Sequence, residues 1–498
     1  MKESVKEPSN KQSPIITPEM LQSPTKVDQQ AIMQDQSTHQ TDYPFSYWLK
    51  KNNYYHQRMK SFYQSKIPRN SSVLHINCAN GYVLDAVEAS VGVGVESNKN
   101  YIAQAKETYP QFNFFHGAIS NVNVSYQFDY IVLSFATMEA DDIQTLLQQL
   151  HPFCHPGTRI VVETYSYLWE PMLWITQKLG LRRPTQFKNW LSQYDVQNFL
   201  HLAGFEVITT TAHMLMPLYI PVISWLCNTL LAPLPIINHL CLHQNVIARP
   251  IQPAHTLQQQ TVSVIVTCRN EMGNIERVVK ECPRMGKHTE LIFVEGGSKD
   301  GTLKEIQRIA DTYQHEWDIS WFVQDGTGKG DAVRKGFKHA KGDILMILDG
   351  DLTMPAQELP KFFEALVMSK GEFINGSRLV YSMESGAMRF LNLLANFFFG
   401  VIFSWLLEQR VKDTLCGTKV LWRNDYERIT ANRSLFGLED PFGDFDLLFG
   451  ASKLNLKIID MPIRYKDRTY GQTNIRRFWH GFILLWISIT AMRKFKFR

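Results

Sequence analysis

Short apolar runs alternate with helical patterns along two long stretches of the chain. In the first stretch the runs lie at 73–76, 91–95, 112–115, 130–133 and 159–162. In the second stretch they begin at Val262 and continue at 291–294, 319–323, 344–348 and 373–374. An alternation of strands and helices is typical of a parallel sheet wrapped by helices. The pattern therefore predicts two α/β domains in series.

The flanking segments differ from these stretches. Residues 1–42 are rich in Gln, Ser, Pro and Lys and contain no apolar core of signal-peptide length, so we expect a disordered tail. Residues 249–260 are polar, contain two prolines, and are interpreted as a linker. The predicted organisation is a first domain at 43–248, a second domain at 261–475, and an apolar helix with a basic tail at 476–498.

Two uncharged segments are unusual for a soluble domain. Residues 214–242 are divided by four prolines into pieces too short to span a bilayer. Residues 390–407 are uncharged for eighteen positions, which is the lower limit for a spanning helix. We predict amphipathic helices that lie on a membrane or line an apolar substrate groove, with burial in the core as the alternative.

The C-terminus supports a membrane surface as partner. Basic residues follow the apolar run 481–492, at Arg493, Lys494, Lys496 and Arg498. This pairing suits an anionic membrane surface, and a solvated tail on a core helix is the alternative. We predict a cytoplasmic protein that is peripheral at the inner face of the membrane.

Composition and charge narrow the function classes. The 498 residues are 44% hydrophobic and 20% charged, which is typical of a globular protein. The net charge of +5 is small and scattered, so no nucleic-acid partner is predicted. Seven widely spaced cysteines form no metal-binding pattern and indicate a reduced, cytoplasmic setting.

Asp349-Gly350-Asp351 follows the predicted strand 344–348 and places two carboxylates at the carboxyl end of a sheet strand. Open α/β sheets bind ligands at that edge. A divalent cation can bridge two carboxylates to a nucleoside diphosphate, and hard oxygen ligands suit Mg²⁺ or Mn²⁺. A DxD triplet is also common turn chemistry, so the triplet alone does not decide the function.

Four further loops occur in a fixed order around this triplet. They are the strand and loop TVSVIVTCRNE at 261–271, the glycine-containing loop at 295–302, the loop GTGKG at 326–330, and Gly376-Ser377-Arg378. Together with the triplet they resemble glycosyltransferase family 2 of the GT-A fold, in the branch of dolichyl-phosphate mannose and polyprenyl-phosphate sugar synthases. The resemblance covers about residues 261–475.

The resemblance implies a nucleotide-sugar donor and transfer with inversion at the anomeric carbon. The family's metal ligands correspond to Asp349 and Asp351. The family's donor-binding residues correspond to Thr267, Arg269, Asn270, Glu271, Glu295, Lys329, Asp349 and Gly350. Glu295-Gly296 stands where the family usually has Asp-Asp, and Thr267 where it usually has Pro, so the acidic contact is kept in a longer form.

Acceptor chemistry is implied by later segments. Residues 413–419 resemble the family's acceptor-side loop, and 441–446 supply Asp444 and Asp446. For a hydroxyl acceptor such as a glycan, Asp444 would act as general base. A lipid-phosphate acceptor instead needs cations, for which the candidates are Arg378, Arg464 and Arg468. Residues 468–473 resemble the family's Arg-containing phosphate loop; surface salt bridging is the alternative for these arginines.

The first domain has a second motif. A strand followed by a small-residue loop reads VLHINCANG at 73–81, and Glu96 ends the next predicted strand. This spacing is typical of a nucleoside site, with the carboxylate on ribose hydroxyls. With the strand 128–134, the order resembles the Rossmann-like class I S-adenosylmethionine methyltransferases. The implied cofactor-binding residues are Asn77, Ala79, Gly81, Glu96 and Ser134.

The loop of the first domain departs from that family. His75, Asn77 and Ala79 stand where the family has an acid and two glycines, and only Gly81 remains. An active methyltransferase and an inactive or scaffolding domain are therefore both open. For the whole chain we predict a bifunctional protein, with nucleotidyltransfer, or a membrane-associated assembly factor with inactive domains, as alternatives. The retained Asp349-Gly350-Asp351 argues against the assembly factor.

Overall fold

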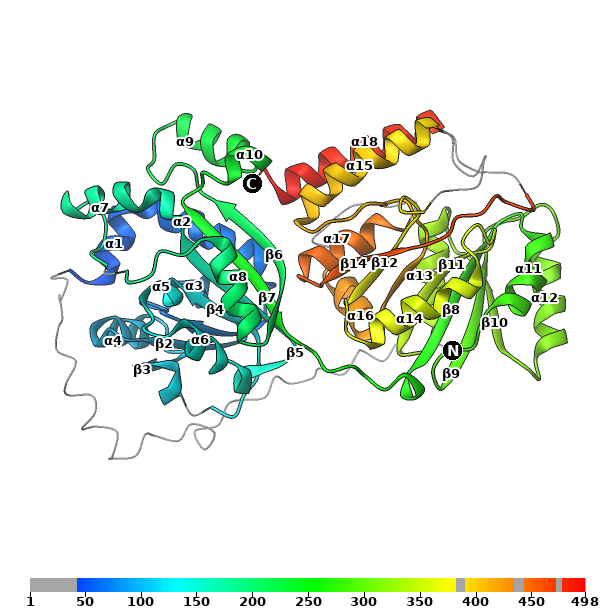
Figure 1. Ribbon diagram of the computed structural model, residues 1–498, viewed down its shortest axis with the longest axis horizontal. Coiled ribbons are helices and arrows are strands. Elements are labelled where there is room, and N and C mark those ends of the chain that lie inside the picture. Colours follow the sequence, from blue (N-terminus) through cyan, green and yellow to red (C-terminus); the bar gives the residue numbers. More distant parts are fainter. Residues whose placement is uncertain are drawn as a thin grey trace, which may run out of the picture. The chain divides into compact units, whose positions relative to one another are not determined.

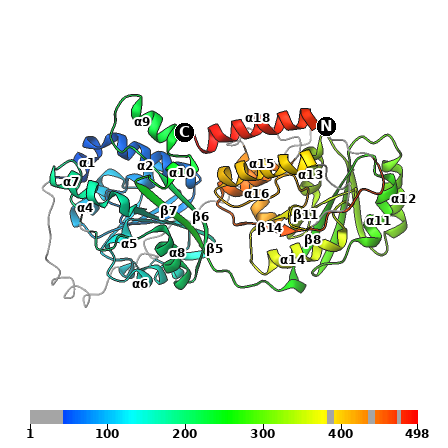
Figure 2. The ribbon, with the colours of Figure 1, turned by 45° about the horizontal axis from the view of Figure 1, so that its top comes forward.

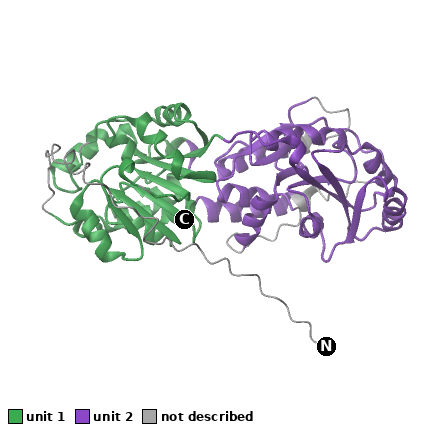
Figure 3. Cartoon of the chain, turned by 90° about the horizontal axis from the view of Figure 1, so that it is seen from below, with its two compact units in different colours: residues 1–232, 236–251 green, residues 233–235, 252–498 purple. Residues whose placement is uncertain are grey.

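The structure is a computed structural model that describes residues 43–122, 124–185, 187–381, 390–433, 443–471 and 477–497. The polypeptide divides into two compact units, residues 1–232 with 236–251 and residues 233–235 with 252–498 (Figure 3). Within the described residues, each unit is built on a seven-stranded sheet. The prediction of two α/β domains in series is thereby confirmed. The expected tail, 1–42, lies outside the described residues.

In unit 1 the strand order is β3-β2-β1-β4-β5-β7-β6. The first five strands along the chain are parallel: β1 (Ser72–Ile76), β2 (Val91–Glu96), β3 (Asn113–His116), β4 (Phe128–Ser134) and β5 (Cys154–Tyr165). Every residue of β1 is buried, as expected for a strand covered on both faces. Since β1 pairs with β2 on one side and β4 on the other, the sheet has a topological switch point there, where α/β proteins bind ligands.

The last two strands of unit 1 were not predicted. β6 (Phe205–His213) and β7 (His243–Pro250) are antiparallel to each other, and β7 is antiparallel to β5. The uncharged segment 214–242 joins them through three short pieces, α9 (Ile223–Trp225), the π-helix η7 (Leu226–Leu231) and α10 (Pro235–Asn238). The expectation of a wholly parallel sheet is thus wrong at this edge, because β7 turns back along β6 to lie beside β5.

Helices pack on both faces of the unit 1 sheet (Figure 1). One face carries a core in which Val73 and Val83 pack with Tyr63, and the opposite face carries a core with Leu74 and Leu200. This division follows from the two-residue repeat of a strand. The helices are α1 (Phe45–Lys51), α2 (Asn53–Lys66), α3 (Tyr82–Ala86), α4 (Lys99–Thr108), α5 (Ala136–Glu139), α6 (Ile143–Gln148), α7 (Glu170–Lys178) and α8 (Gln193–Leu202).

In unit 2 the strand order is β10-β9-β8-β11-β13-β12-β14. The strands are β8 (Thr261–Cys268), β9 (His288–Glu295), β10 (Asp318–Val323), β11 (Ile344–Asp349), β12 (Phe373–Ser377), β13 (Lys419–Trp422) and β14 (Ile458–Pro462). β13 is antiparallel to both of its neighbours, β11 and β12, whereas the other pairs are parallel. β8 lies between β9 and β11, so the loops that follow these three strands lie at one sheet edge.

Helices again cover both faces in unit 2 (Figure 2). One core contains residues of α11 (Met272–Glu281), α12 (Thr302–Tyr313) and α14 (Leu359–Val367). The other contains residues of α13 (Lys329–His339), α15 (Phe390–Leu407), α16 (Arg423–Ala431), α17 (Phe445–Lys453) and α18 (Arg477–Phe495). α15 and α18 lie side by side (Figures 1 and 2). None of the helices in the described part of the chain has both the length and the hydropathy required to cross a membrane.

Candidate active sites at two sheet edges

The paired carboxylates of unit 2 lie where the sequence predicts them. Asp349 is the last residue of β11 and is in register with Thr267 on β8. Its Oδ1 is 3.4 Å from Thr267 Oγ1, and the amide of Gly350 donates to the Thr267 carbonyl at 3.1 Å. A Cβ at position 350 would lie 3.0 Å from that carbonyl oxygen, so glycine permits the close approach. Three predicted donor-site residues therefore meet at one point.

Lys329 supplies a positive charge to this point from the first residue of α13. Its Nζ is 2.5 Å from Asp349 Oδ1, and both side chains are partly exposed. Burial would raise the pKa of Asp349, but the ammonium of Lys329, with Lys419 and Arg378 beyond it, lowers that pKa below its ordinary value. Gly417 packs directly against this ion pair, because a Cβ at position 417 would overlap both Asp349 and Lys329.

Asp351 has a different partner, Arg468, which is distant in sequence. Arg468 Nη2 is 2.5 Å from Asp351 Oδ2, and Arg468 Nη1 is 3.2 Å from Glu271 Oε1. Burial raises the pKa of Glu271 to about 7, although hydrogen bonding by Asn274 and the charge of Arg468 lower it. One guanidinium thus links the metal-ligand candidate Asp351 with the first donor loop.

The loops after β8 and β9 are tied together. Asn270 has a left-handed backbone, with φ of 58°. Its amide donates to Ser298 Oγ at 2.9 Å, and its Oδ1 accepts from the Lys299 amide at 2.8 Å. Glu295, buried at the end of β9, accepts from the Ser298 amide at 2.5 Å. Arg269, in the loop after β8, is exposed. The predicted donor residues therefore form one continuous rim.

A segment near the C-terminus lies against this rim. The ring of Tyr470 lies over Gly273, where a Cβ would be 2.6 Å from the ring. Tyr470 donates to Asp300 at 3.3 Å, and Arg277 donates to Thr469 at 2.6 Å. These contacts hold the segment against α11 and bring Arg468 to the carboxylates. The sequence motif had indicated Arg468 but gave no signal for its two acidic partners.

The acceptor-side candidates are more dispersed. Asp444 is buried 3.5 Å from the Lys419 ammonium, and Asp446 pairs with Arg433 at 2.7 Å. Arg378 is held by both oxygens of the buried Asp413, at 2.7 and 2.8 Å. The guanidinium of Arg378 thus has an intramolecular partner, a pairing that its sequence motif did not indicate. Arg464 is exposed. Positions 441, 442, 472 and 473, also named in the sequence motifs, lie outside the described residues.

The loop after β1 forms the second candidate site, in unit 1. Asn77, Ala79 and Gly81 all have positive φ, at 58°, 49° and 81°, so the turn keeps its left-handed residues without two of the expected glycines. The buried Glu96 accepts from the Ala79 amide at 2.9 Å and from the Asn98 amide at 2.9 Å. Glu96 therefore lies directly beside the loop, as the nucleoside motif requires.

Two other residues of this edge are engaged by protein groups. Asn77 donates to Glu139 at 2.8 Å. The hydroxyl of Ser134, at the end of β4, is 2.8 Å from His75 Nε2 and 2.9 Å from the Tyr63 hydroxyl. Burial lowers the pKa of His75 to about 3, so His75 is neutral at physiological pH. A neutral imidazole therefore occupies the position of the acid expected on β1.

Comparison with protein-family models gives one match in each unit. Residues 263–426 match glycosyl transferase family 2, and residues 48–210 match a methyltransferase domain. The dolichol-phosphate mannosyltransferase of Saccharomyces cerevisiae is 37% identical over 110 residues, which are 21% of this chain and 40% of that protein. An undecaprenyl-phosphate 4-deoxy-4-formamido-L-arabinose transferase of Edwardsiella ictaluri is 34% identical over 110 residues, 21% of this chain and 34% of the relative. The chain thus spans less than half of either relative.

Solved structures of low identity also match. Glucosyl-3-phosphoglycerate synthase from Mycobacterium tuberculosis, in complex with Mn²⁺, uridine diphosphate and glucosyl-3-phosphoglycerate, is 18% identical, with 48% of this chain and 81% of that chain covered and a TM-score of 0.35. A SAM-dependent methyltransferase from Thermotoga maritima is 12% identical, with 42% and 94% covered and a TM-score of 0.32.

Proposed function

We propose that this chain, which carries a family 2 glycosyltransferase domain and a methyltransferase domain in series, transfers a sugar from a nucleotide-sugar donor to a polyprenyl-phosphate acceptor, with inversion at the anomeric carbon. The observation that carries the proposal is the convergence of Asp349, Asp351, Lys329, Arg468 and Glu271 at one sheet edge. The relatives named for dolichol phosphate and undecaprenyl phosphate support this acceptor class.

The donor site has the ligands that a hard cation requires. Asp349 and Asp351 offer carboxylate oxygens in one turn, beside the nucleoside rim. When bound, Mg²⁺ or Mn²⁺ would neutralise the diphosphate and stabilise its charge as a leaving group. In this arrangement Lys329, which now pairs with Asp349, would instead donate to a diphosphate oxygen, and Arg468, which now pairs with Asp351, would become available to the acceptor phosphate. The rim at Glu271 and Glu295 would hold the nucleoside.

The acceptor chemistry follows from charge. A lipid phosphate is already an anion, so it needs cations rather than a general base. Arg468 contacts Asp351 at the donor site, and the exposed Arg464 precedes it by four positions. A glycan hydroxyl would need Asp444 as base. Asp444 is buried with its Oδ1 3.5 Å from the Lys419 ammonium, so a protein cation already occupies the side of the carboxylate that would accept the proton. Polyprenyl phosphate is the acceptor that this set of groups fits better.

Two helices of unit 2 provide a surface for a membrane-borne acceptor. Among the side chains that the structure describes, the exposed large apolar ones of α15 are Leu394, Phe397, Phe398 and Val401, and those of α18 are Phe482, Leu485, Trp486 and Ile489. Both sets have the spacing i, i+3, i+4, i+7 of one helix face. Arg493 and Lys494 lie in the last turn of α18. An outward apolar stripe on each helix, next to basic residues, supports peripheral binding to an anionic inner membrane face.

Unit 1 is proposed as a degraded S-adenosylmethionine methyltransferase. The left-handed turn at Asn77, Ala79 and Gly81, and Glu96 beside it, support retained nucleoside binding. The neutral His75 in place of an acid argues for weakened contact with the methionine amine. Isothermal titration of the full chain with S-adenosylmethionine tests this. Loss of binding in Glu96→Gln, with Glu107→Gln on the surface as control, supports it, and no heat at millimolar ligand refutes retained binding.

The principal test is a donor screen with the purified chain and either Mn²⁺ or Mg²⁺. Polyprenyl phosphate serves as acceptor, and release of free nucleoside diphosphate is measured. Chelator should abolish release, and so should Asp351→Asn. Asp318→Asn is the matched control, because Asp318 lies at the start of the edge strand β10. Activity that persists in chelator or in Asp351→Asn would end the proposal, and pyrophosphate as product would indicate a nucleotidyltransferase.

Membrane binding has a separate test. Sedimentation with anionic vesicles should carry down the full chain, and Phe397→Glu with Trp486→Glu should reduce the bound fraction several-fold. Met368→Glu, at another exposed apolar position of unit 2, is the control. If the double variant bound vesicles as well as the Met368→Glu control, the two apolar stripes would not contact lipid.

A further inference from the structure

Glu163, His213 and His243 form a cluster on one face of the unit 1 sheet. His243 on β7 is in register with His213 on β6 and with Tyr165 on β5. Residues directly opposite one another share a face, and Glu163 shares the face of Tyr165 because it precedes it by two positions. Three adjacent strands therefore direct two imidazoles and one carboxylate toward the same region, far from the glycosyltransferase motifs in sequence.

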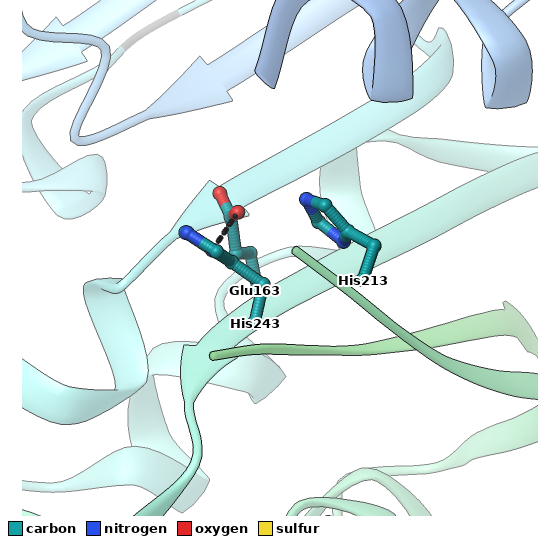
Figure 4. Close-up of side chains that lie close together, drawn as sticks. All are labelled: Glu163, His213 and His243. Atoms are coloured by element: carbon teal, nitrogen blue, oxygen red, sulfur yellow. Dashed lines mark ion pairs between the residues drawn. The ribbon is translucent and has the colours of Figure 1, made fainter. Parts of the chain in front are cut away.

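The three side chains lie within the reach of a single ion. Glu163 Oε1 is 2.7 Å from His243 Nδ1. One ligand atom from each residue lies within 4.8 Å of the other two, and His213 faces the pair from the neighbouring strand (Figure 4). The side chains of Glu163 and His243 are 1% and 0% exposed. Among the residues that the structure describes, this is the one such group of three.

Each histidine of the cluster has a buried Nε2 atom without a hydrogen bond in the described part of the chain. His213 Nε2 and His243 Nε2 are buried without a hydrogen bond among the described residues. Buried polar atoms in proteins are almost always satisfied, so two such nitrogens in one cluster call for a ligand. Both are imidazole nitrogens, which bind a cation through the lone pair. This observation is independent of the spacing of the three residues.

Neighbouring groups fix the orientation of the ligands. Tyr63 donates to the second oxygen of Glu163. The side-chain amide of Asn245 lies 3.0 Å from His213 Nδ1, and Asn245 Oδ1 has no partner. Turning that amide over places Oδ1 to accept from Nδ1–H, which leaves the lone pair of His213 Nε2 for a ligand. Metal-binding histidines are oriented in this way.

We propose that Glu163, His213 and His243 bind one divalent cation of the Zn²⁺ class. Two imidazoles and a carboxylate are ligands that Zn²⁺ accepts, and nitrogen ligands disfavour Mg²⁺ and Ca²⁺. Glu163 Oε1 and His243 Nδ1 lie 2.7 Å apart without a hydrogen bond to any described residue, so both atoms are available to the ion. Three protein ligands leave a fourth position open, as in catalytic zinc sites. Tyr63 contacts both Glu163 and Ser134, so the ion lies beside the proposed cofactor edge.

Metal analysis of the full chain tests this site. The Asp351→Asn chain is used throughout, so that the carboxylate pair of unit 2 does not contribute. After chelator treatment and addition of Zn²⁺, gel filtration and elemental analysis should find one zinc per chain, which excess Mg²⁺ does not displace. Adding His213→Gln should weaken Zn²⁺ binding by at least the roughly 100-fold that loss of a group supporting a metal ligand can cost. His201→Gln, at an exposed position of α8, is the control and should not.

X-ray absorption on the zinc-loaded Asp351→Asn chain gives a readout that does not depend on the folding of a ligand variant. Scattering from two imidazoles together with oxygen ligands is expected. A chain that binds no stoichiometric zinc, or zinc without imidazole scattering, would overturn the site and leave a buried Glu–His ion pair. Unchanged affinity in His213→Gln would overturn it as well. None of these outcomes depends on whether the glycosyltransferase proposal holds.

Discussion

Replacing Gly417 with alanine places a methyl group inside the donor site. The new Cβ would lie 2.0 Å from Asp349 Oδ2 and 2.2 Å from Lys329 Nζ, whereas ordinary contacts begin at 3.4 Å. The carboxylate must therefore move by about 1.4 Å. Metal–ligand distances tolerate about 0.2 Å, and a misplacement of about 1 Å costs roughly 100-fold in rate. We expect turnover to fall about 100-fold, or about 2.7 kcal/mol in the activation free energy.

The fold should survive this change. Both atoms that the methyl group meets are at the ends of side chains that are partly exposed, so they can move without displacing backbone. Nucleoside diphosphate release at saturating donor and metal measures turnover, and thermal unfolding checks the fold. Gly481→Ala is the matched control, because a Cβ there meets nothing within 4 Å. Wild-type turnover in Gly417→Ala would show that the carboxylate of Asp349 does not need its present position.

Three further predictions concern charge and backbone. Burial raises the pKa of Glu271 to about 7, so the neutral carboxyl contributes stability that is fully present below pH 4.5 and is lost as the pH rises through about 7. The melting temperature of the wild type should therefore fall between these pH values, and that of Glu271→Gln should fall less. Asp413→Ala leaves Arg378 without its counter-charge and should lower the free energy of unfolding, measured in urea, by about 3–5 kcal/mol. A variant as stable as the wild type would contradict a buried ion pair. Asn270→Ala removes the acceptor for the Lys299 amide at a left-handed position, so the free energy of unfolding should fall by about 1–3 kcal/mol. Donor affinity should fall as well, and an unchanged donor affinity would argue against a role of Asn270 in the donor site.

The sequence determined the two sheets and the end of the strand at which each motif lies. Period-two and fully apolar runs are local signals, so β8, β9 and β11, with the motifs at Asn270, Glu295 and Asp349, were predictable before any contact was known. Parallel pairing then places the ends of these strands at one edge. The same reasoning put Glu96 beside the loop after β1, where the structure has it.

Only the tertiary structure decided which charged groups meet. Arg468 contacts residues 117 and 197 positions away, and Arg378 contacts Asp413 rather than open solvent. The histidines of β6 and β7 face Glu163 because β7 pairs antiparallel with β5 and β6 pairs antiparallel with β7. The apolar pattern of the sequence does not predict these two strands. Such pairings are set by strand order and register between distant segments, and no local pattern of residues encodes them.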